Sequence, residues 1–311
     1  MTEIAGLSLR EDSVLWTELA RDEKLIHIKK TVFETLPVFI NHKTMQLHST
    51  TATLSKFLKD IIKNNNLSRQ NIRVTIPGRF AIIKKIPVDK SIPAESVPEL
   101  IFFEFEKSWE ESPQNYHIYL PENMPVQNSS ENILAVAIRK NTLDFFNKLL
   151  DQAGLSVEMI SPSCFTVEEL FKRFFPRSGG QSILLGWNRR GFDAIITDGE
   201  EFLNYFFRSY TINFDPIEKV TEYDLASSFS NIIFDIQNPT NLEHSLYDIN
   251  NVYNFGYYFT PEWLEFMRSR IQLPINLFNY DVTSNFQITS EDSRVSSENI
   301  FKYIESLSPV I

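Results

Sequence analysis

The chain has 311 residues and only 9 glycines, where average usage of roughly 7% would give about 22. With 42% hydrophobic and 23% charged residues, the composition is globular rather than disordered. The formal net charge of −10 argues against the broad basic face that non-specific nucleic-acid binding requires, so we expect no nucleic-acid partner. The scarcity of glycine argues against classes built on glycine-rich phosphate loops, and the sequence contains no P-loop motif.

The single cysteine, Cys164, excludes an intramolecular disulfide and zinc sites built from several thiolates. It opens an apolar helical pattern, so we interpret it as a small buried residue rather than a nucleophile. The five histidines show no metal-ligand spacing, and we expect no metal site. No run approaches the roughly 18 uncharged apolar residues of a membrane span, and the N-terminal residues lack a signal-peptide pattern. We therefore expect a cytoplasmic protein.

The first half of the sequence opens with three short apolar runs, at 4–9, 13–19 and 25–28, which have the spacing of a three-stranded meander. Periodicity then predicts helices at about 51–63, 97–109, 142–153 and 165–175, and strands at 72–76, 80–88, 116–120, 133–138 and 157–160. Gly154 follows the third helix as a C-cap glycine.

The second half opens in the same way. Strands are predicted at 182–187, 192–197, 202–208, 251–255 and 275–278, and helices at about 223–237, 261–271 and 296–307. Each half thus begins with a β-meander and continues into alternating helices and strands, which indicates an internal duplication in the order of elements. We expect an α/β protein with halves at 1–175 and 181–311, joined by a turn-rich linker at 176–180.

Four segments, at 5–15, 74–106, 134–155 and 251–275, carry a family resemblance. They include AGLSLREDSVL at the start, VTIPGRFAIIKKIP before an acidic helix, and NVYNFGYY in the second half. Their order and spacing resemble those of the PilM family of type IV pilus assembly, a branch of the actin-like ATPases that has relatives in type II secretion and in FtsA. The resemblance implies a duplicated actin-like (ribonuclease H-like) fold, with a small α/β subdomain inserted in the first half at about 88–161.

In proteins of that fold, ATP lies between the halves. Two hairpin turns hold the phosphates through backbone N–H groups, an aspartate in each hairpin serves the metal or the attacking water, and a glycine pair accommodates the adenine. This sequence departs at each of those places. They hold Ser8, Arg10 and Leu15 in the first hairpin, Leu185, Gly186 and Trp187 in the second, and Gly256 alone in the adenosine turn.

Two interpretations of this degenerate cleft remain open. In the first, Arg10 compensates for the lost glycines and binds a phosphate together with Asn188, Arg189 and Arg190. In the second, these arginines are solvated turn residues and side chains close the cleft. We favour the second, because hydrolysis also needs the carboxylates, and Ser8 and Leu185 stand at the positions where the family has its aspartates. We therefore expect a protein without a cofactor and without ATPase activity, with binding of ATP and magnesium as the alternative.

The resemblance also implies a function. Members of the family act as cytoplasmic scaffolds, recruited to the inner membrane by binding a short N-terminal peptide of a single-span, PilN-like partner in a groove of the inserted subdomain. The candidate groove residues here are Phe102, Phe103, Phe105, Tyr116 and Tyr119, although core packing accounts for most of them. A homo-oligomer stays open, as do two alternatives: an actin-like ATPase with divergent loops, and a stand-alone interaction protein of this fold.

Overall fold

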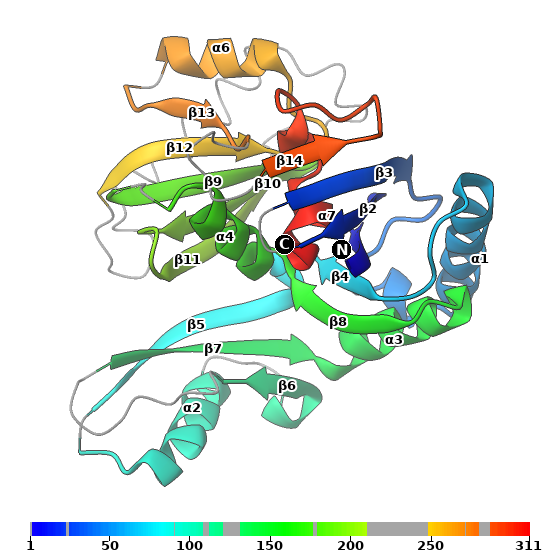
Figure 1. Ribbon diagram of the computed structural model, residues 1–311. Coiled ribbons are helices and arrows are strands. Elements are labelled where there is room, and N and C mark those ends of the chain that lie inside the picture. The colour runs from blue at the N-terminus through cyan, green and yellow to red at the C-terminus, as the bar shows by residue number, and fades with distance from the viewer. Residues whose placement is uncertain are drawn as a thin grey trace.

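The computed structural model describes residues 2–22, 25–89, 91–107, 112–120, 131–176, 179–209, 248–270, 272–279 and 287–311. Among these residues the strands form three sheets, of six, five and three strands (Figure 1). The helix predicted at 223–237 and residues 177–178 of the predicted linker lie outside the described residues.

The first sheet is built around the predicted N-terminal meander. In spatial order its strands are β14 (Gln287–Ser290), β3 (Leu25–Thr35), β2 (Ser13–Arg21), β1 (Thr2–Leu9), β4 (Ile72–Ile76) and β8 (Val157–Pro162). Strands β1, β2 and β3 pair antiparallel, whereas β4 and β8 continue the sheet in parallel beyond β1 and β14 joins β3 in parallel. The meander and strand β4 confirm the prediction for this part of the chain.

The second sheet repeats this arrangement. Its strands follow the order β11 (Phe202–Ser209), β10 (Gly191–Thr197), β9 (Gln181–Trp187), β12 (Ile249–Phe255) and β13 (Ile275–Leu277). An antiparallel meander is again followed by two parallel strands, so β9, β10, β11, β12 and β13 correspond to β1, β2, β3, β4 and β8. The duplication predicted from the order of elements is therefore confirmed.

Helices cover the outer faces of the two large sheets (Figure 1). Helices α1 (His48–Asn65) and α3 (Lys140–Ala153) pack on one face of the first sheet. Helix α6 (Pro261–Arg270) packs on the second sheet, and α4 (Ser163–Phe174) joins the second sheet to the C-terminal segment. Helix α3 ends at Gly154, which has φ = 76°, as expected for a C-cap glycine.

The alternation of side chains along β1 decides what each face of the first sheet contacts. Ala5, Leu7 and Leu9 belong to the core beneath α1 and α3, whereas Ile4 belongs to the core shared with the second sheet. Gly6 lies on that second face, towards the C-terminal segment. The two large sheets thus share one hydrophobic core.

The small sheet has the order β5 (Ala81–Val88), β7 (Glu131–Arg139) and β6 (Tyr116–Tyr119), and helix α2 (Val97–Glu106) packs on one of its faces. The limits expected for the inserted subdomain, 88–161, differ from this arrangement at both ends. Strand β5 belongs to the small sheet because it pairs with β7, whereas α3 and β8 belong with the first sheet. We propose 81–139 as the better limits.

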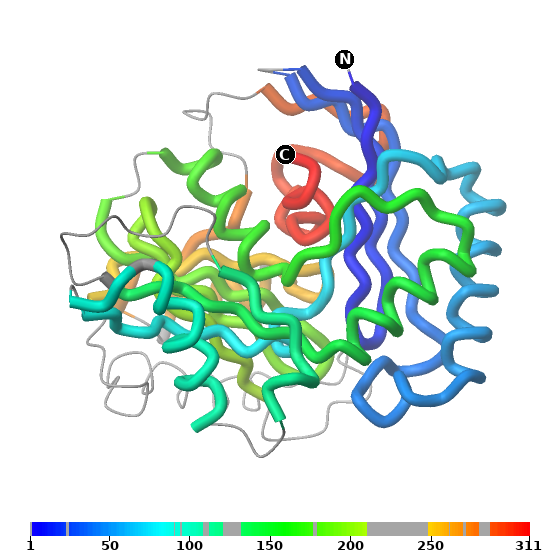
Figure 2. Tube along the Cα trace, turned by 90° about the horizontal axis from the view of Figure 1, so that it is seen from below, coloured from blue at the N-terminus to red at the C-terminus, as the bar shows by residue number. Residues whose placement is uncertain are grey.

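The C-terminal segment departs furthest from its prediction. In place of one helix at 296–307, it forms a 3-10 turn at Ile300–Lys302, the single-turn helix α7 (Ile304–Leu307) and another 3-10 turn at Ser308–Val310. Residues 303–311 are all buried, because the segment runs between the first sheet and the rest of the protein (Figure 2). The second half is therefore not self-contained, since β14 and this segment both join the first sheet.

Gly6 should be required for this packing. A Cβ atom at Gly6 would overlap the carbonyl oxygen of Ser306 in α7, so Gly6→Ala must displace backbone. We expect the substitution to lower the free energy of unfolding by about 1–3 kcal/mol in urea titrations. Gly179→Ala is the control, because a Cβ atom there meets nothing within 4 Å and should change stability by less than about 0.5 kcal/mol. Equal effects of the two substitutions would contradict this account.

Candidate functional site

The duplication brings two equivalent hairpin turns together. The β1–β2 turn is closed by a hydrogen bond from the Arg10 N–H to the Ser13 carbonyl, at 2.9 Å. The β9–β10 turn is closed by the matching bond from the Asn188 N–H to the Gly191 carbonyl, at 2.8 Å. Both backbone donors are therefore used within their own turns.

The side chain of Arg10 joins the two hairpins. It is 3% exposed, and its Nη2 donates to the carbonyl oxygen of Trp187 at 2.9 Å and to the Oδ1 of Asn188. Its Nε lies 3.1 Å from the Oε2 of Glu305 in α7. One buried guanidinium thus connects the first hairpin, the second hairpin and the C-terminal segment.

The charges around Arg10 are strongly coupled. Burial lowers the pKa of Arg10, but the carboxylates of Glu305, Asp12 and Asp193 together outweigh this effect and hold the pKa above its usual value. Burial also raises the pKa of the Glu305 carboxyl to about 7, against the attraction of Arg10, with Asp193 and Asp12 adding to the rise. Arg10 is therefore firmly cationic, whereas Glu305 titrates near neutral pH.

Glu305 and Asp193 are functional-site residues that the sequence did not indicate. Asp193 is 6% exposed on β10 and accepts hydrogen bonds from the Asn188 Nδ2 and, at 2.5 Å, from the Tyr205 hydroxyl. Burial of the Tyr205 hydroxyl, followed by the negative charge of Asp193, raises the pKa of Tyr205 well above the usual value. Each carboxylate stands in an apolar stretch of sequence, which is the only signal that predicts a buried acidic residue.

Trp187 fills the region on the other side of the second hairpin. It is 1% exposed, and its Nε1–H donates to the Oδ1 of Asn254 at 2.9 Å. Gly256 has φ = 120°, and a Cβ atom there would lie 2.6 Å from the Trp187 carbonyl oxygen. A Cβ atom at Gly186 would lie 2.6 Å from the ring of Phe255. The predicted cleft residues are thus packed against one another.

The remaining cleft residues are also buried. Ser8 is 2% exposed, and Leu15 and Leu185 lie in the core shared by the two large sheets. Of the predicted anion-binding group, Arg10 and Asn188 contact each other, whereas the Arg190 guanidinium stacks on Phe39 at 3.6 Å from the ring centroid.

The five predicted groove residues do not form one surface. Phe105 and Tyr116 are buried in the core of the small sheet, which explains them as packing residues. Phe102 and Phe103 are 40% and 51% exposed on α2. Tyr119 is 50% exposed, and because it alternates with core-facing residues of β6 it lies on the opposite face of the small sheet from α2.

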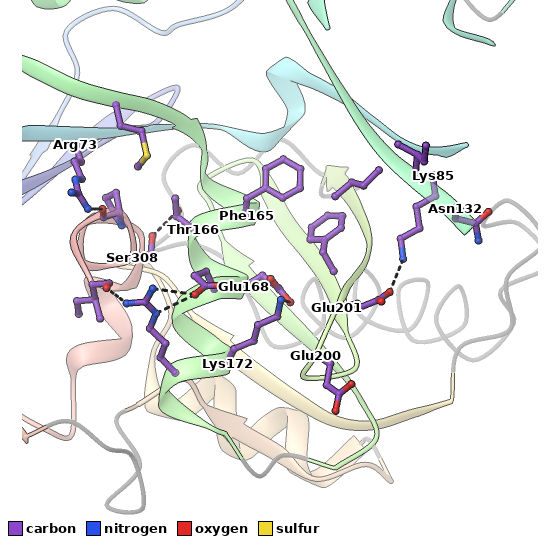
Figure 3. Close-up of a pocket in the computed structure, with 18 of the residues that line it drawn as sticks. Arg73, Lys85, Asn132, Phe165, Thr166, Glu168, Lys172, Glu200, Glu201 and Ser308 are labelled. Carbon is purple, nitrogen blue, oxygen red and sulfur yellow. Dashed lines mark hydrogen bonds and ion pairs between the residues drawn. The ribbon is translucent and has the colours of Figure 1, made fainter. Parts of the chain in front are cut away.

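A cavity of about 730 Å³ lies between the small sheet, α4, the β10–β11 turn and the C-terminal segment (Figure 3). Its lining includes Lys85 and Leu134 of the small sheet, Phe165 of α4, Glu201 of the turn and Ser308 of the C-terminal segment. No sequence signal predicts it, because its walls come from segments far apart in the chain.

Two structural features are absent from the described part of the chain. None of its helices is long and apolar enough to cross a membrane. It contains no group of three or more histidine, cysteine, aspartate or glutamate residues arranged to hold a metal ion.

The contribution of the Arg10–Glu305 pair can be measured with a double-mutant cycle at pH 8, above the Glu305 pKa of about 7. Arg10→Met removes the cation that favours the charged form of Glu305, so the buried carboxyl group must either stay charged without a partner or take up a proton, and we expect a loss of about 3–5 kcal/mol in the free energy of unfolding. Adding Glu305→Gln should recover part of that loss, because it removes the unpaired charge.

The same cycle at pH 5.5 is the control. Glu305 takes up a proton below its folded-state pKa, so the loss caused by Arg10→Met should shrink. Additive losses at pH 8, or a loss that does not change with pH, would contradict the assigned pairing.

Comparisons with known proteins place this geometry in a fold family. No protein-family model matches the sequence, and no curated protein matches it. The PilM–PilN type IV pilus biogenesis complex aligns with a TM-score of 0.71 at 13% identity, over 99% of this chain and 95% of the other. The cytoplasmic domain of EpsL, an inner-membrane component of the type II secretion system of Vibrio cholerae, aligns with a TM-score of 0.50 at 11% identity, over 96% and 93%.

At sequence identities of 13% and 11%, the similarity shows that the folds are alike. It extends over nearly the full length of both chains and agrees with the duplicated order of strands. The chain has the actin-like fold, in the form seen in the PilM–PilN complex, as the sequence resemblance predicted.

Proposed function

We propose that the chain is a cytoplasmic scaffold of a type IV pilus or related secretion assembly platform. It binds the N-terminal peptide of a single-span, PilN-like inner-membrane protein, through which it is recruited to the membrane, and it does not hydrolyse ATP. The full-length similarity of its fold to the PilM–PilN complex supports the scaffold role. The similarity to the cytoplasmic domain of EpsL supports a place in this group of machines.

The contacts of Arg10 carry the proposal that ATP is not hydrolysed. The guanidinium spans the space between the two hairpins, where the resemblance would place phosphates. Asp12 accepts a hydrogen bond from the Ser13 hydroxyl at 2.8 Å, and Asp193 is held by Asn188 and Tyr205. These contacts support the proposal, because a triphosphate bound between the hairpins would have to displace them.

We assign the peptide site to the cavity and to the adjoining face of the small sheet. On the face opposite α2, Ile83, Val136 and Tyr119 are cross-strand neighbours in one row, and Lys85 and Leu134 form the row that lines the cavity. A half-buried apolar sheet face beside a cavity suits an extended peptide, which gains contact area along the strands. Of the predicted groove residues, only Tyr119 belongs to this surface.

Binding of the partner's peptide tests the function and the location together. The probe is the cytosolic N-terminal peptide of a PilN-like single-span membrane protein from the same genome, immobilised for biolayer interferometry. We expect wild-type protein to bind it, and Tyr119→Ala to weaken binding at least about fivefold, as for an exposed aromatic interface residue.

Phe103→Ala is the matched control, because Phe103 is as exposed as Tyr119 but lies on α2. It should leave the affinity within about twofold. Absence of binding by the wild type would remove the scaffold proposal, and a larger effect at Phe103 would move the site to the α2 surface.

A further inference from the structure

The cavity has charges of opposite sign at its two ends (Figure 3). At one end, three arginines converge on the C-terminal segment. Arg21 donates to the main-chain oxygen of Ile311 at 2.7 Å, Arg173 donates to the same atom, and Arg73 donates to the Pro309 carbonyl oxygen at 3.3 Å. Three guanidinium groups are therefore held close together around two main-chain oxygens.

This arginine end has an excess of donors. Burial lowers the pKa of the Arg21 guanidinium most, and the positive charges of Arg73 and Arg173 lower it further. Arg73 and Arg173 also pair with Glu158 and Glu169, but these glutamate side chains are 44% and 53% exposed and contribute little at the surface. A carboxylate entering the cavity here would accept charge-assisted hydrogen bonds and relieve the repulsion.

The other end carries the opposite charge. Glu200 and Glu201 lie in the β10–β11 turn, across the cavity from Arg73 in Figure 3. The Glu201 side chain is 74% exposed, and the Lys85 ammonium lies 4.0 Å from its carboxylate, at the limit of an ion pair. Because these two carboxylates face a single ammonium group at the limit of ion-pair distance, this end of the cavity can bind a further cation.

The middle of the cavity is lined by apolar side chains and by one buried glutamate that has a lysine partner. The rings of Phe165 and Phe202 lie 4.8 Å apart, and Leu134 lines the cavity from the small sheet. Glu168 is buried there, but it pairs with Lys172 at 3.0 Å and accepts a hydrogen bond from Thr197. The charge of this glutamate is therefore compensated within the protein.

We propose that the cavity binds an extended peptide in one direction. An acidic side chain of the peptide lies at Arg21, Arg73 and Arg173, apolar residues lie over Phe165, and a cationic group lies at Glu200 and Glu201. Charge complementarity of this kind fixes orientation and register. The inference rests on the proposed function and gives it a ligand chemistry: an acidic residue and a basic residue separated by an apolar stretch.

Selection from a library of random 12-residue peptides, displayed with free N-termini, tests this with the full-length protein. We expect the wild type to enrich peptides that carry an acidic and a basic position in a constant order around apolar residues. Arg73→Glu should change the preferred residue at the acidic position of the peptides to a basic one and leave the basic position unchanged. Glu201→Lys should change the preferred residue at the basic position to an acidic one and leave the acidic position unchanged. Both residues are partly exposed, so the variants should fold.

A charge-swapped peptide gives the quantitative measurement. Arg73→Glu should lower the affinity for the peptide that binds the wild type best by about tenfold. Replacing the acidic residue of that peptide by lysine should restore its affinity for the variant. Lys59→Glu on α1 and Glu99→Lys on α2 are matched controls, because both residues are exposed and neither lines the cavity. They should leave selection and affinity unchanged.

The outcomes separate the two claims. Enrichment of peptides without an ordered charge pair, or equal effects of the cavity and control variants, would overturn the charge assignment while leaving peptide binding intact. Failure of the wild type to enrich any peptide would overturn both this inference and the proposed peptide-binding function.

Discussion

The buried guanidinium of Arg10 is the contact on which the arrangement of the two halves depends. A buried charge is tolerated only when hydrogen bonds and an opposite charge satisfy it. Here those partners come from the second hairpin and from Glu305 of α7, so all three elements must be in place together. The space between the two hairpins is thereby part of the packed interior.

The C-terminal segment contacts both the packed space around Arg10 and the charged cavity. Glu305 faces Arg10, while Ser308 and Pro309 line the cavity a few residues later. The segment is held by hydrogen bonds from the Thr75 hydroxyl to the Glu305 carbonyl, at 3.2 Å, and between the Thr17 and Ser306 hydroxyls, at 2.7 Å. A single buried segment therefore stabilises the contact between the halves and shapes the surface to which we assign the peptide.

Local patterns predicted most of the fold, whereas features that join distant segments were not predictable. The meanders and Gly154 follow from alternation and turn chemistry, which are encoded within a few residues. The limits of the small sheet depend on the pairing of β5 with β7. The predicted helix at 296–307 was wrong, because the segment divides into 3-10 turns and one helical turn, and residues 303–311 are buried against distant parts of the chain that no local pattern encodes. Arg10 was recognisable as a departure from the family, but its partner Glu305 lies at the far end of the sequence.

We expect that the space between the two hairpins does not accept a nucleotide. Isothermal titration of the full-length chain with magnesium-ATP tests this most directly, at pH 8, where both members of the Arg10–Glu305 pair are charged. The contacts of Arg10 and Trp187 predict no saturable heat at nucleotide concentrations up to the millimolar range. Saturable binding with a micromolar dissociation constant would contradict the account.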